Sequence, residues 1–561
     1  MFARLTIQVT LMAAIAAPLA AAPPKGAELN VIPRPAKVEV GEGTFELTGG
    51  TVLLAEGDAR AEAEKLAAAL RTATGFELPV RAKAKDGSAI RLQLDAALEA
   101  ELGKEGYALA VEPAGVIIRA AAPAGLFYGG VTLRQLLPEF IFSDTVVKQV
   151  SLAVPEIGGH VRREPPRPVR WTIPCVRIAD RPRFAWRGLL LDPARHFLPP
   201  ADVKRMIDLI ALHKLNSLQM HLTDDQGWRI EIRKYPLLTQ VGSVRAESPR
   251  LGDRRKGDGK PYGPFFYTQA QVRELVAYAA ERNVTIVPEI EMPGHFLAAL
   301  SAFPHLSCTG GPFKPWTRWG ISHDILCAGN DESVQFAQDV LAEVVELFPS
   351  RFIHIGGDEA PRDRWKACPK CQARMKAEGL ASEAQLQTWF NSRIEKFLAS
   401  KGRRMIGWDE ILEGGLTPQA AVMSWRGTAG GLAAAGAGHD VVMSPTSHCY
   451  FDYAQSKAPG EPEAIGGLIP LARVYGFEPI PPGLPAERHK HILGAQGNLW
   501  SEYLHGRKDV EYFAFPRAAA LAEAVWSPAG PRDFADFRAR LAVHLRRLDQ
   551  LDVNYRKETE E

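Results

Sequence analysis

Hydrophobic and polar positions follow two different patterns along this chain, and the change between them predicts two regions. From about residue 28 to 165, short runs of alternating apolar and polar residues are separated by Gly and Pro, most clearly at 37–47, 107–120 and 126–137. Alternation with a period of two is typical of β-strands that bury one face. One stretch, 59–75, has helical periodicity instead. These runs predict a small α+β domain over residues 28–165.

The second pattern follows a polar, proline-rich segment at 158–170 and predicts a domain from 178 to 550. Short apolar runs here alternate with longer amphipathic stretches. Eight runs have the length of buried strands: 187–192, 217–222, 285–292, 352–357, 404–410, 421–425, 440–445 and 492–500. The clearest amphipathic helices are predicted at 201–214, 268–283 and 333–348.

Eight strands alternating with helices predict an α/β fold, a (β/α)8 TIM barrel preceded by the small α+β domain. A doubly wound open sheet is the alternative. It is disfavoured because no Gly-rich dinucleotide-binding motif follows a first strand. The final residues, 551–561, are predicted to form a polar tail.

The N-terminal residues resemble an export signal. Arg4 provides a positive start, 5–17 are mainly apolar, and 20–22 are small. The apolar run is short for a bilayer span of about 20 residues. We therefore expect residues 1–22 to be a cleaved signal peptide, and the mature protein to be periplasmic or secreted without stable membrane insertion.

Net charge and cysteine content narrow the possible partners. The formal net charge is only +2 and there is no basic tract, so nucleic-acid binding has no electrostatic support.

Cys308 and Cys327 bracket a loop and are expected to form a disulfide in an oxidising compartment. Cys368 and Cys371 form a CPKC pair, for which a loop disulfide is favoured over zinc because no second CxxC follows. The sequence does not fix the pairing, and Cys175 and Cys449 are expected to be buried or unpaired.

Charged residues, a histidine and aromatic residues follow the predicted strands of the barrel. In strand order they are Arg195, Asp224, His295, Asp358 with Glu359, Trp408, Trp425, Tyr450 with Asp452, and Trp500 with Glu502. The carboxyl ends of the strands are where TIM barrels carry their active sites. A ring of carboxylates is costly to bury without a polar ligand or a network, and aromatic faces with carboxylates suit a sugar.

A metal site is the competing interpretation, because His221, Asp224, Asp225 and His295 are all ligand types. No local H-x-H or HExxH arrangement supports it. We therefore expect neither a metal nor a cofactor in this site.

The adjacent carboxylates Asp358 and Glu359 follow two glycines, which are expected to allow a sharp exit from the strand. The usual retaining glycosidase places two carboxylates about 5 Å apart, on either side of the scissile bond. Neighbours leaving a strand tend to point apart, so these two are not expected to form that pair.

Four motifs together resemble the β-N-acetylhexosaminidases of glycoside hydrolase family 20: HIGGDE at 354–359, HLTDDQGWR at 221–229, PEIEMPGH at 288–295 and LLLDPARHF at 189–197. The resemblance extends over most of the chain. It implies a catalytic (β/α)8 barrel behind an α+β domain, without a cofactor. It also implies removal of terminal β-linked N-acetylglucosamine or N-acetylgalactosamine from oligosaccharides, in which the substrate's own acetamido oxygen is the nucleophile.

The resemblance also implies roles for the residues at the strand ends. Glu359 would be the general acid and base, Asp358 would orient the acetamido N–H, and Tyr450 would donate to the acetamido oxygen. Asp224 and His295 would form a relay beside Glu359. Substrate contacts would come from Arg195, Trp408, Trp425, Asp452, Trp500 and Glu502.

Three other functions stay open. One is a disaccharide-releasing member of the same family, which would need a wider pocket. Another is a carbohydrate-binding protein without turnover, which would not need a matched acid and orienting pair. The third is a metal-dependent deacetylase, which a chelator would inhibit. The natural glycan, the GlcNAc or GalNAc preference and the oligomeric state do not follow from the sequence.

Overall fold

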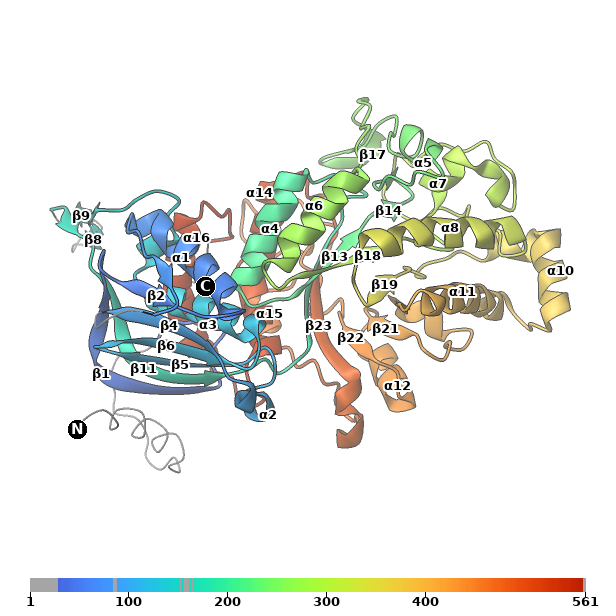
Figure 1. The fold of residues 1–561 in the computed structure, drawn as a ribbon. Coiled ribbons are helices and arrows are strands. Elements are labelled where there is room, and N and C mark those ends of the chain that lie inside the picture. The colour runs from blue at the N-terminus through green and yellow to red at the C-terminus, as the bar shows by residue number, and fades with distance from the viewer. Residues whose placement is uncertain (1–28, 84–87, 152, 156–160, 164, 558–561) are drawn as a thin grey trace.

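The computed structural model describes residues 29–83, 88–151, 153–155, 161–163 and 165–557. The predicted signal peptide and the last residues of the predicted tail, 558–561, lie outside these ranges. Figure 1 shows a small sheet domain beside a larger domain of alternating strands and helices. Among the described helices, none is both long enough and apolar enough to cross a bilayer.

The first domain is built on a seven-stranded sheet with two helices on one face (Figure 1). In spatial order the strands are β1 (Lys37–Leu47), β11 (Trp171–Asp180), β5 (Tyr107–Glu112), β6 (Gly115–Ala120), β4 (Ala89–Leu94), β2 (Val52–Leu54) and β3 (Val80–Arg81). The helices are α1 (Ala59–Thr74) and α3 (Pro123–Leu136). Their buried sides pack on the sheet and form the core of this domain.

The β-like run predicted at 126–137 is wrong, because these residues form most of α3. Pro123 stands in the first turn of the helix, where its missing N–H costs nothing. Leu126, Leu133 and Leu136 then recur at helical spacing and are buried. A Cβ on Gly129 would lie 2.5 Å from Ile118 Cγ2, so this position carries a glycine for packing rather than for a turn.

The first domain extends beyond the boundary predicted at 165. Strand β11 pairs antiparallel with both β1 and β5, so the chain returns to the first sheet after the polar segment at 158–170. The barrel starts at Trp186 rather than near residue 178.

Residues 551–557 do not form the polar tail predicted from the sequence. Val553 and Arg556 are buried, and the Arg556 N–H donates to the Phe515 carbonyl at 3.1 Å.

The second domain is a closed barrel of eight parallel strands, which confirms the predicted fold class. Its strands are β12 (Trp186–Leu191), β13 (Ser217–His221), β18 (Thr285–Glu289), β19 (Phe352–His354), β20 (Arg404–Trp408), β21 (Ala421–Ser424), β22 (Val441–Met443) and β23 (Ile492–Leu499). All eight correspond to the runs read from the sequence. Their carboxyl ends gather the predicted site residues at one mouth.

Helices surround this barrel (Figure 1). The longer ones are α4 (Pro200–Leu212), α6 (Gln269–Ala280), α8 (Asp331–Leu347), α10 (Pro369–Glu378), α11 (Glu383–Ser400), α12 (Ala429–Ala437), α14 (Arg507–Ala514), α15 (Arg517–Trp526) and α16 (Phe534–Gln550). The sequence explains their placement: in α4, Val203, Met206 and Ile210 bury one face. A capping box at Thr268 and Gln271 starts α6.

Shorter elements occupy the connections. They are α2 (Glu99–Leu102), α5 (Leu237–Gln240), α7 (Leu297–Ala302), α9 (Asp363–Ala367), α13 (Leu471–Tyr475), β7 (Gln149–Val150), β8 (Ala153–Pro155), β9 (Val161–Arg163), β10 (Arg167–Pro168), β14 (Thr223–Asp224), β15 (Gly227–Trp228), β16 (Pro249–Arg250) and β17 (Asp253–Gly257).

Buried charges join the two domains. Asp180, at the end of β11, lies 2.9 Å from the Nζ of Lys214 in the barrel, and both side chains are fully buried. Tyr107 Oη and Trp526 Nε1 donate to the same carboxylate, at 2.7 and 3.0 Å. The Arg187 guanidinium reaches Glu105 of the first domain at 2.6 Å, away from the barrel mouth. The two domains therefore share one polar core.

Candidate active site

Two glycines place the adjacent carboxylates at the barrel mouth. Gly356 and Gly357 follow β19 with φ of 64° and 90°, in the left-handed region that glycine adopts without strain. A Cβ on Gly356 would lie 1.7 Å from the Oε2 of Glu291, and one on Gly357 would lie 2.9 Å from Ile411. The chain can therefore pass close over Glu291 before it presents Asp358 and Glu359, which confirms the expected sharp exit.

His295 connects both of these carboxylates to the layer beneath them. Its Nε2 lies 3.4 Å from the Oε2 of Glu359 and 3.7 Å from the Oδ2 of Asp358. Its Nδ1 lies 3.3 Å from the Oδ1 of Asp224. Burial alone would lower the pKa of His295, but Asp224, Asp225 and Glu359 raise it well above the ordinary value. The predicted contacts of Asp224 and His295 are therefore present.

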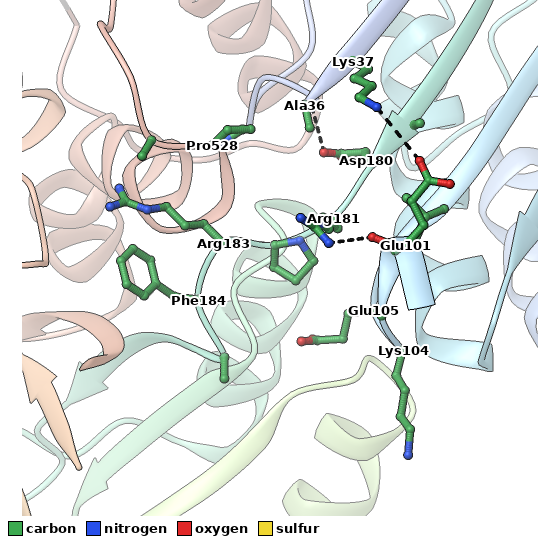
Figure 2. Close-up of a pocket in the computed structure, with 16 residues that line it drawn as sticks. Ala36, Lys37, Glu101, Lys104, Glu105, Asp180, Arg181, Arg183, Phe184 and Pro528 are labelled. Atoms are coloured by element: carbon green, nitrogen blue, oxygen red, sulfur yellow. Dashed lines mark hydrogen bonds and ion pairs between the residues drawn. The ribbon is translucent and has the colours of Figure 1, made fainter. Parts of the chain in front are cut away.

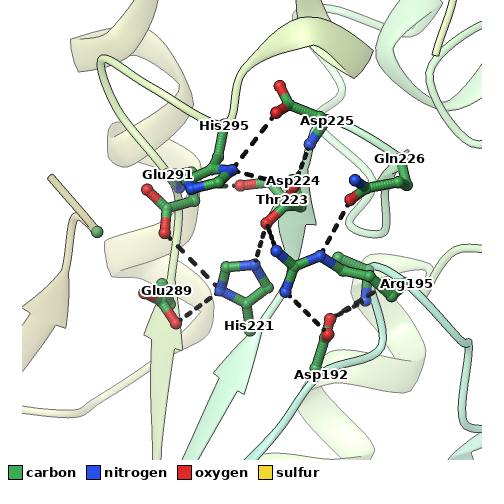
Figure 3. A network of polar contacts seen from close by, with 12 residues as sticks. Asp192, Arg195, His221, Thr223, Asp224, Asp225, Gln226, Glu289, Glu291 and His295 are labelled. Atoms are coloured by element: carbon green, nitrogen blue, oxygen red, sulfur yellow. Dashed lines mark hydrogen bonds and ion pairs between the residues drawn. The ribbon is translucent and has the colours of Figure 1, made fainter. Parts of the chain in front are cut away.

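Figure 3 shows the polar network behind His295. The Arg195 guanidinium contacts Asp224 at 2.7 Å and Asp192 at 3.0 Å, and its Nε donates to Gln226 at 3.0 Å. Burial would raise the pKa of Asp224, but Arg195 and His295 hold it well below its usual range. Arg195 is thus part of the relay's support, and its predicted contact with sugar hydroxyls stays a prediction.

His221 extends the same network, through Glu289, to the indole of Trp408. Its imidazole lies 2.9 Å from Asp224 and 2.8 Å from Glu289. Despite burial, Glu289 and Asp224 raise the pKa of His221 to about 10. Trp408 Nε1 donates to Glu289 at 2.8 Å, so the same carboxylate orients this indole. These contacts give His221 a structural role in the network.

Glu291 is a buried carboxyl group to which sequence reasoning gave no role. Neither of its oxygens has a hydrogen-bond partner among the described residues. Burial, followed by the charges of Asp358 and Glu289, raises the pKa of Glu291 well above the ordinary value. Both effects favour the protonated, neutral form of the Glu291 carboxyl group. Its place in PEIEMPGH, two residues after a strand end, was the only signal in the sequence.

Asp358 also titrates away from its usual range. Burial raises its pKa to about 6, an effect that His295 opposes and Glu359 reinforces. The carboxylate form therefore predominates only above about pH 6. One oxygen of Asp358, Oδ1, has no hydrogen-bond partner among the described residues, so an acceptor is available to a bound donor.

Four aromatic rings form a wall beside Asp358. The ring centroids of Trp408 and Trp500 are 5.7 Å apart, and those of Trp425 and Tyr450 are 6.0 Å apart. Tyr450 lies 6.5 Å from Trp500, which closes the arrangement. The predicted aromatic residues from four strand ends therefore meet in one place.

Glu410 orients this wall, although no role in the site was predicted for it from the sequence. Its Oε2 accepts a 2.9 Å hydrogen bond from Trp425 Nε1. Burial, followed by the charge of Asp358, raises the pKa of Glu410 to about 8. Its position two residues after the strand-end Trp408 was a signal that could have suggested this contact.

Asp452 and Glu502 provide further acceptors near the wall. Both oxygens of Asp452 and the Oε2 of Glu502 have no hydrogen-bond partner among the described residues. Burial and the neighbouring Glu502 raise the pKa of Asp452 well above its usual value. Buried acceptors without partners are costly, so these two suit a ligand rich in hydroxyl groups.

The electrostatics of the relay oppose the metal interpretation. Asp224, Asp225 and His295 lie within ligand distance of one another, as do His221, Glu289 and Glu291. However, the pKa of His221 is raised to about 10, so this imidazole is protonated at pH 7, and the neighbouring carboxylates also raise the pKa of His295 well above its ordinary value. A protonated imidazole has no lone pair for a metal.

A separate groove of about 900 Å³ lies between the two domains (Figure 2). It is lined by residues such as Lys37, Glu101 and Arg183, and none of the strand-end residues is among them. Lys37 and Glu101 pair across it at 4.0 Å. The chemistry described above therefore belongs to the barrel mouth and not to this groove.

Comparisons with known proteins point to one family. The model described as glycosyl hydrolase family 20, catalytic domain, matches residues 184–529, and that family's domain 2 matches 28–181. The β-hexosaminidase of Porphyromonas gingivalis is 45% identical over 530 residues, which cover 94% of this chain and 64% of that protein. The β-hexosaminidase of Akkermansia muciniphila is 35% identical, over 83% of this chain and 88% of its own.

Solved structures agree with this assignment. The GH20 β-N-acetylhexosaminidase from Streptomyces coelicolor superimposes with a TM-score of 0.79 at 33% identity, covering 95% of this chain and 98% of that one. A mutant Streptomyces plicatus β-hexosaminidase in complex with its product GlcNAc gives a TM-score of 0.79 at 32% identity, covering 96% and 98%.

Proposed function

Because this chain belongs to glycosyl hydrolase family 20, we propose that it is an exo-acting β-N-acetylhexosaminidase. It would remove terminal, non-reducing β-linked N-acetylglucosamine or N-acetylgalactosamine from oligosaccharides, chitooligosaccharides included. The names of the relatives and the GlcNAc product bound to the Streptomyces plicatus enzyme support this substrate class.

The observation that carries the proposal is that Asp358 and Glu359 face the same imidazole, at 3.7 and 3.4 Å. A carboxylate nucleophile would have to stand across the scissile bond from the acid. Two carboxylates that contact one imidazole are expected to approach a bound substrate from the same direction, which disfavours their use as an opposed acid and nucleophile. In this proposal the nucleophile is instead the acetamido oxygen of the substrate.

In the first step the acetamido oxygen attacks C1 and forms an oxazolinium ion, while Glu359 gives its proton to the leaving oxygen. Asp358, ionised above about pH 6, accepts from the acetamido N–H and stabilises the positive charge that develops. Tyr450 donates to the acetamido oxygen. In the second step Glu359 takes a proton from water, which opens the ring at C1 with overall retention.

The remaining residues bind the sugar. The wall of Trp408, Trp425 and Trp500 surrounds the acetyl group and the sugar face. Asp452 and Glu502, whose oxygens lack protein partners, accept from the hydroxyl groups. His295 and Asp224 hold Glu359 in place through contacts of 3.4 and 3.3 Å.

The test compares the wild type with Glu359→Gln and Asp358→Asn on an aryl β-N-acetylglucosaminide and on the matching glucoside. We expect the wild type to cleave only the acetamido substrate, and each variant to lose about 10²–10⁴-fold in kcat. Asp363→Asn is the matched control, because that carboxylate is exposed and pairs only with His323 among the described residues.

Comparable cleavage of the glucoside would contradict the acetamido nucleophile. Binding of GlcNAc without cleavage of either substrate would instead indicate a carbohydrate-binding protein. Release of disaccharides from a longer chain would place the protein with the disaccharide-releasing enzymes.

We also propose that the protein is exported to the periplasm or the medium, on the pattern of residues 1–22. N-terminal sequencing of the protein recovered from cell fractions tests this. An intact N-terminus on protein recovered only from the cytoplasm would contradict it.

A further inference from the structure

Four cysteines that are far apart in the sequence meet beside the catalytic loops. Cys308 and Cys327 come from the long connection after α7, and Cys368 and Cys371 from the start of α10. The Sγ atoms are separated by 3.8 Å for 308–371, 3.6 Å for 327–371 and 3.7 Å for 327–368. All four lie within 4.8 Å of one another, and none is in a disulfide. The two disulfides expected from the sequence, 308–327 and 368–371, are thus not formed.

These distances match a tetrahedral metal site. Zinc binds thiolates at about 2.3 Å, so the edges of a ZnS4 tetrahedron are about 3.8 Å long. A disulfide requires about 2.05 Å between the sulfur atoms. These three separations, out of the six among four sulfur atoms, lie close to the tetrahedral edge.

The backbone around the cluster is arranged for four sulfur atoms. Pro369 starts α10, so the CPKC segment turns into the helix with Cys368 at its N-cap and Cys371 in its first turn. Gly329 lets the other loop approach: a Cβ there would lie 2.2 Å from the Lys370 carbonyl carbon. Cys327, Cys368 and Cys371 are buried.

We propose that Cys308, Cys327, Cys368 and Cys371 bind one structural Zn²⁺ ion. CxxC at a helix start supplies two ligands, and the connection after α7 supplies the two that the sequence pattern lacked. The site stands apart from the reaction, because none of these cysteines touches the carboxylate relay in the described structure.

The zinc would fix two loops that carry catalytic groups. Leu326, next to Cys327, donates its N–H to the carbonyl of Pro293, two residues before His295. Trp365 of α9, in the segment that follows Glu359, donates to the Leu326 carbonyl at 2.8 Å. The metal would therefore hold the His295 loop and the Glu359 loop in a constant relation.

The full chain, purified without chelator, should contain one equivalent of zinc by elemental analysis. Cys371→Ser and Cys327→Ser should each lose at least nine-tenths of the zinc and unfold at a Tm several degrees lower. Cys175→Ala is the matched control, because Cys175 is a buried free cysteine of the first domain and should keep the full equivalent.

If a serine variant does not fold, the wild type still decides the matter. A mercurial reagent that titrates four thiols should release one zinc, detected with a chromogenic chelator. An intact mass lower by four hydrogen atoms, with no zinc, would show two disulfides and overturn the proposal. Four reactive thiols that take up no added zinc, or an equivalent of iron in its place, would also overturn it.

Discussion

The carboxyl group of Asp358 links activity to stability through its pKa. The pKa of Asp358 rises from 3.8 to about 6 on folding, which means that the folded state holds the proton more tightly than the unfolded state does. Ionisation of Asp358 therefore lowers the stability of the folded state. The resulting destabilisation is absent below pH 3.8, grows between pH 3.8 and 6, and reaches at most about 3 kcal/mol above pH 6. The same ionisation is required for Asp358 to stabilise the developing positive charge.

Asp358→Asn is therefore expected to raise the Tm at pH 7.5 while it removes activity. At pH 3.5 the two proteins should melt alike, because the wild-type carboxyl is protonated in both states. Thermal melts across this range measure the difference. A wild type that gains stability over the variant as the pH rises would contradict the raised pKa.

The wild-type value of kcat/KM should fall below about pH 6, because the carboxylate form of Asp358 is then lost. A pH–rate profile on the aryl β-N-acetylglucosaminide measures this limb. A profile flat to pH 4.5 would show that Asp358 ionises at its ordinary value, or that its charge is not needed.

At the scale of the element, the exit of β19 depends on a glycine for two separable reasons. Gly356 has φ of 64°, and its missing Cβ also leaves room for Glu291. Gly379, which ends α10, has nearly the same φ of 66° but open space around it. Alanine variants of these two glycines therefore distinguish the cost of backbone strain from the cost of a steric clash with Glu291.

Gly379→Ala should cost about 1–2 kcal/mol of stability and leave kcat unchanged. Gly356→Ala should cost more and lower kcat by about 100-fold, because Glu291 and the chain that carries Asp358 must shift. Denaturant melts and initial rates of both variants provide the measurement. Equal losses of stability with intact kcat would show that the contact with Glu291 is unimportant.

Elements of the barrel could be predicted from the sequence because each of its strands is a short apolar run, buried on both faces and bounded by polar residues. The run at 126–137 was predicted as β-like because its glycines are typical of turns. Only their packing partners in the fold show that they belong to a helix. Strand ends likewise predicted which residues meet at the mouth. Contacts made across the fold, such as Trp425 with Glu410, have no local pattern. Neither does the contact between Cys308 and Cys371, which are 63 residues apart.

At the scale of the whole molecule, the buried pair of Asp180 and Lys214 should make the two domains unfold together. Both side chains have no exposure, so removing one leaves a buried charge without its partner. We expect Asp180→Leu to cost about 3–5 kcal/mol, and the double variant with Lys214→Met to recover much of that loss. Calorimetry should show one transition in the wild type.

The exposed pair of Arg177 and Glu112 is the matched control, and Glu112→Gln should cost at most about 1 kcal/mol. Two separate transitions in the wild type, or equal effects at the buried and exposed pairs, would contradict a shared core.

The contacts of helix α16 determine when the first domain can complete its packing during synthesis. Arg540 on this helix donates to the carbonyl of Val31, which is 509 residues earlier, and Arg547 donates to the carbonyls of Asn30 and Gln135. Trp526 also belongs to the hydrophobic core of the first domain. The sheet domain is synthesised first, yet the groups that cover its inner side leave the ribosome only after the barrel has been translated. The surface of the first domain that contacts α16 and Trp526 therefore stays exposed to solvent for most of translation. The first domain is completed only when these C-terminal residues have been made.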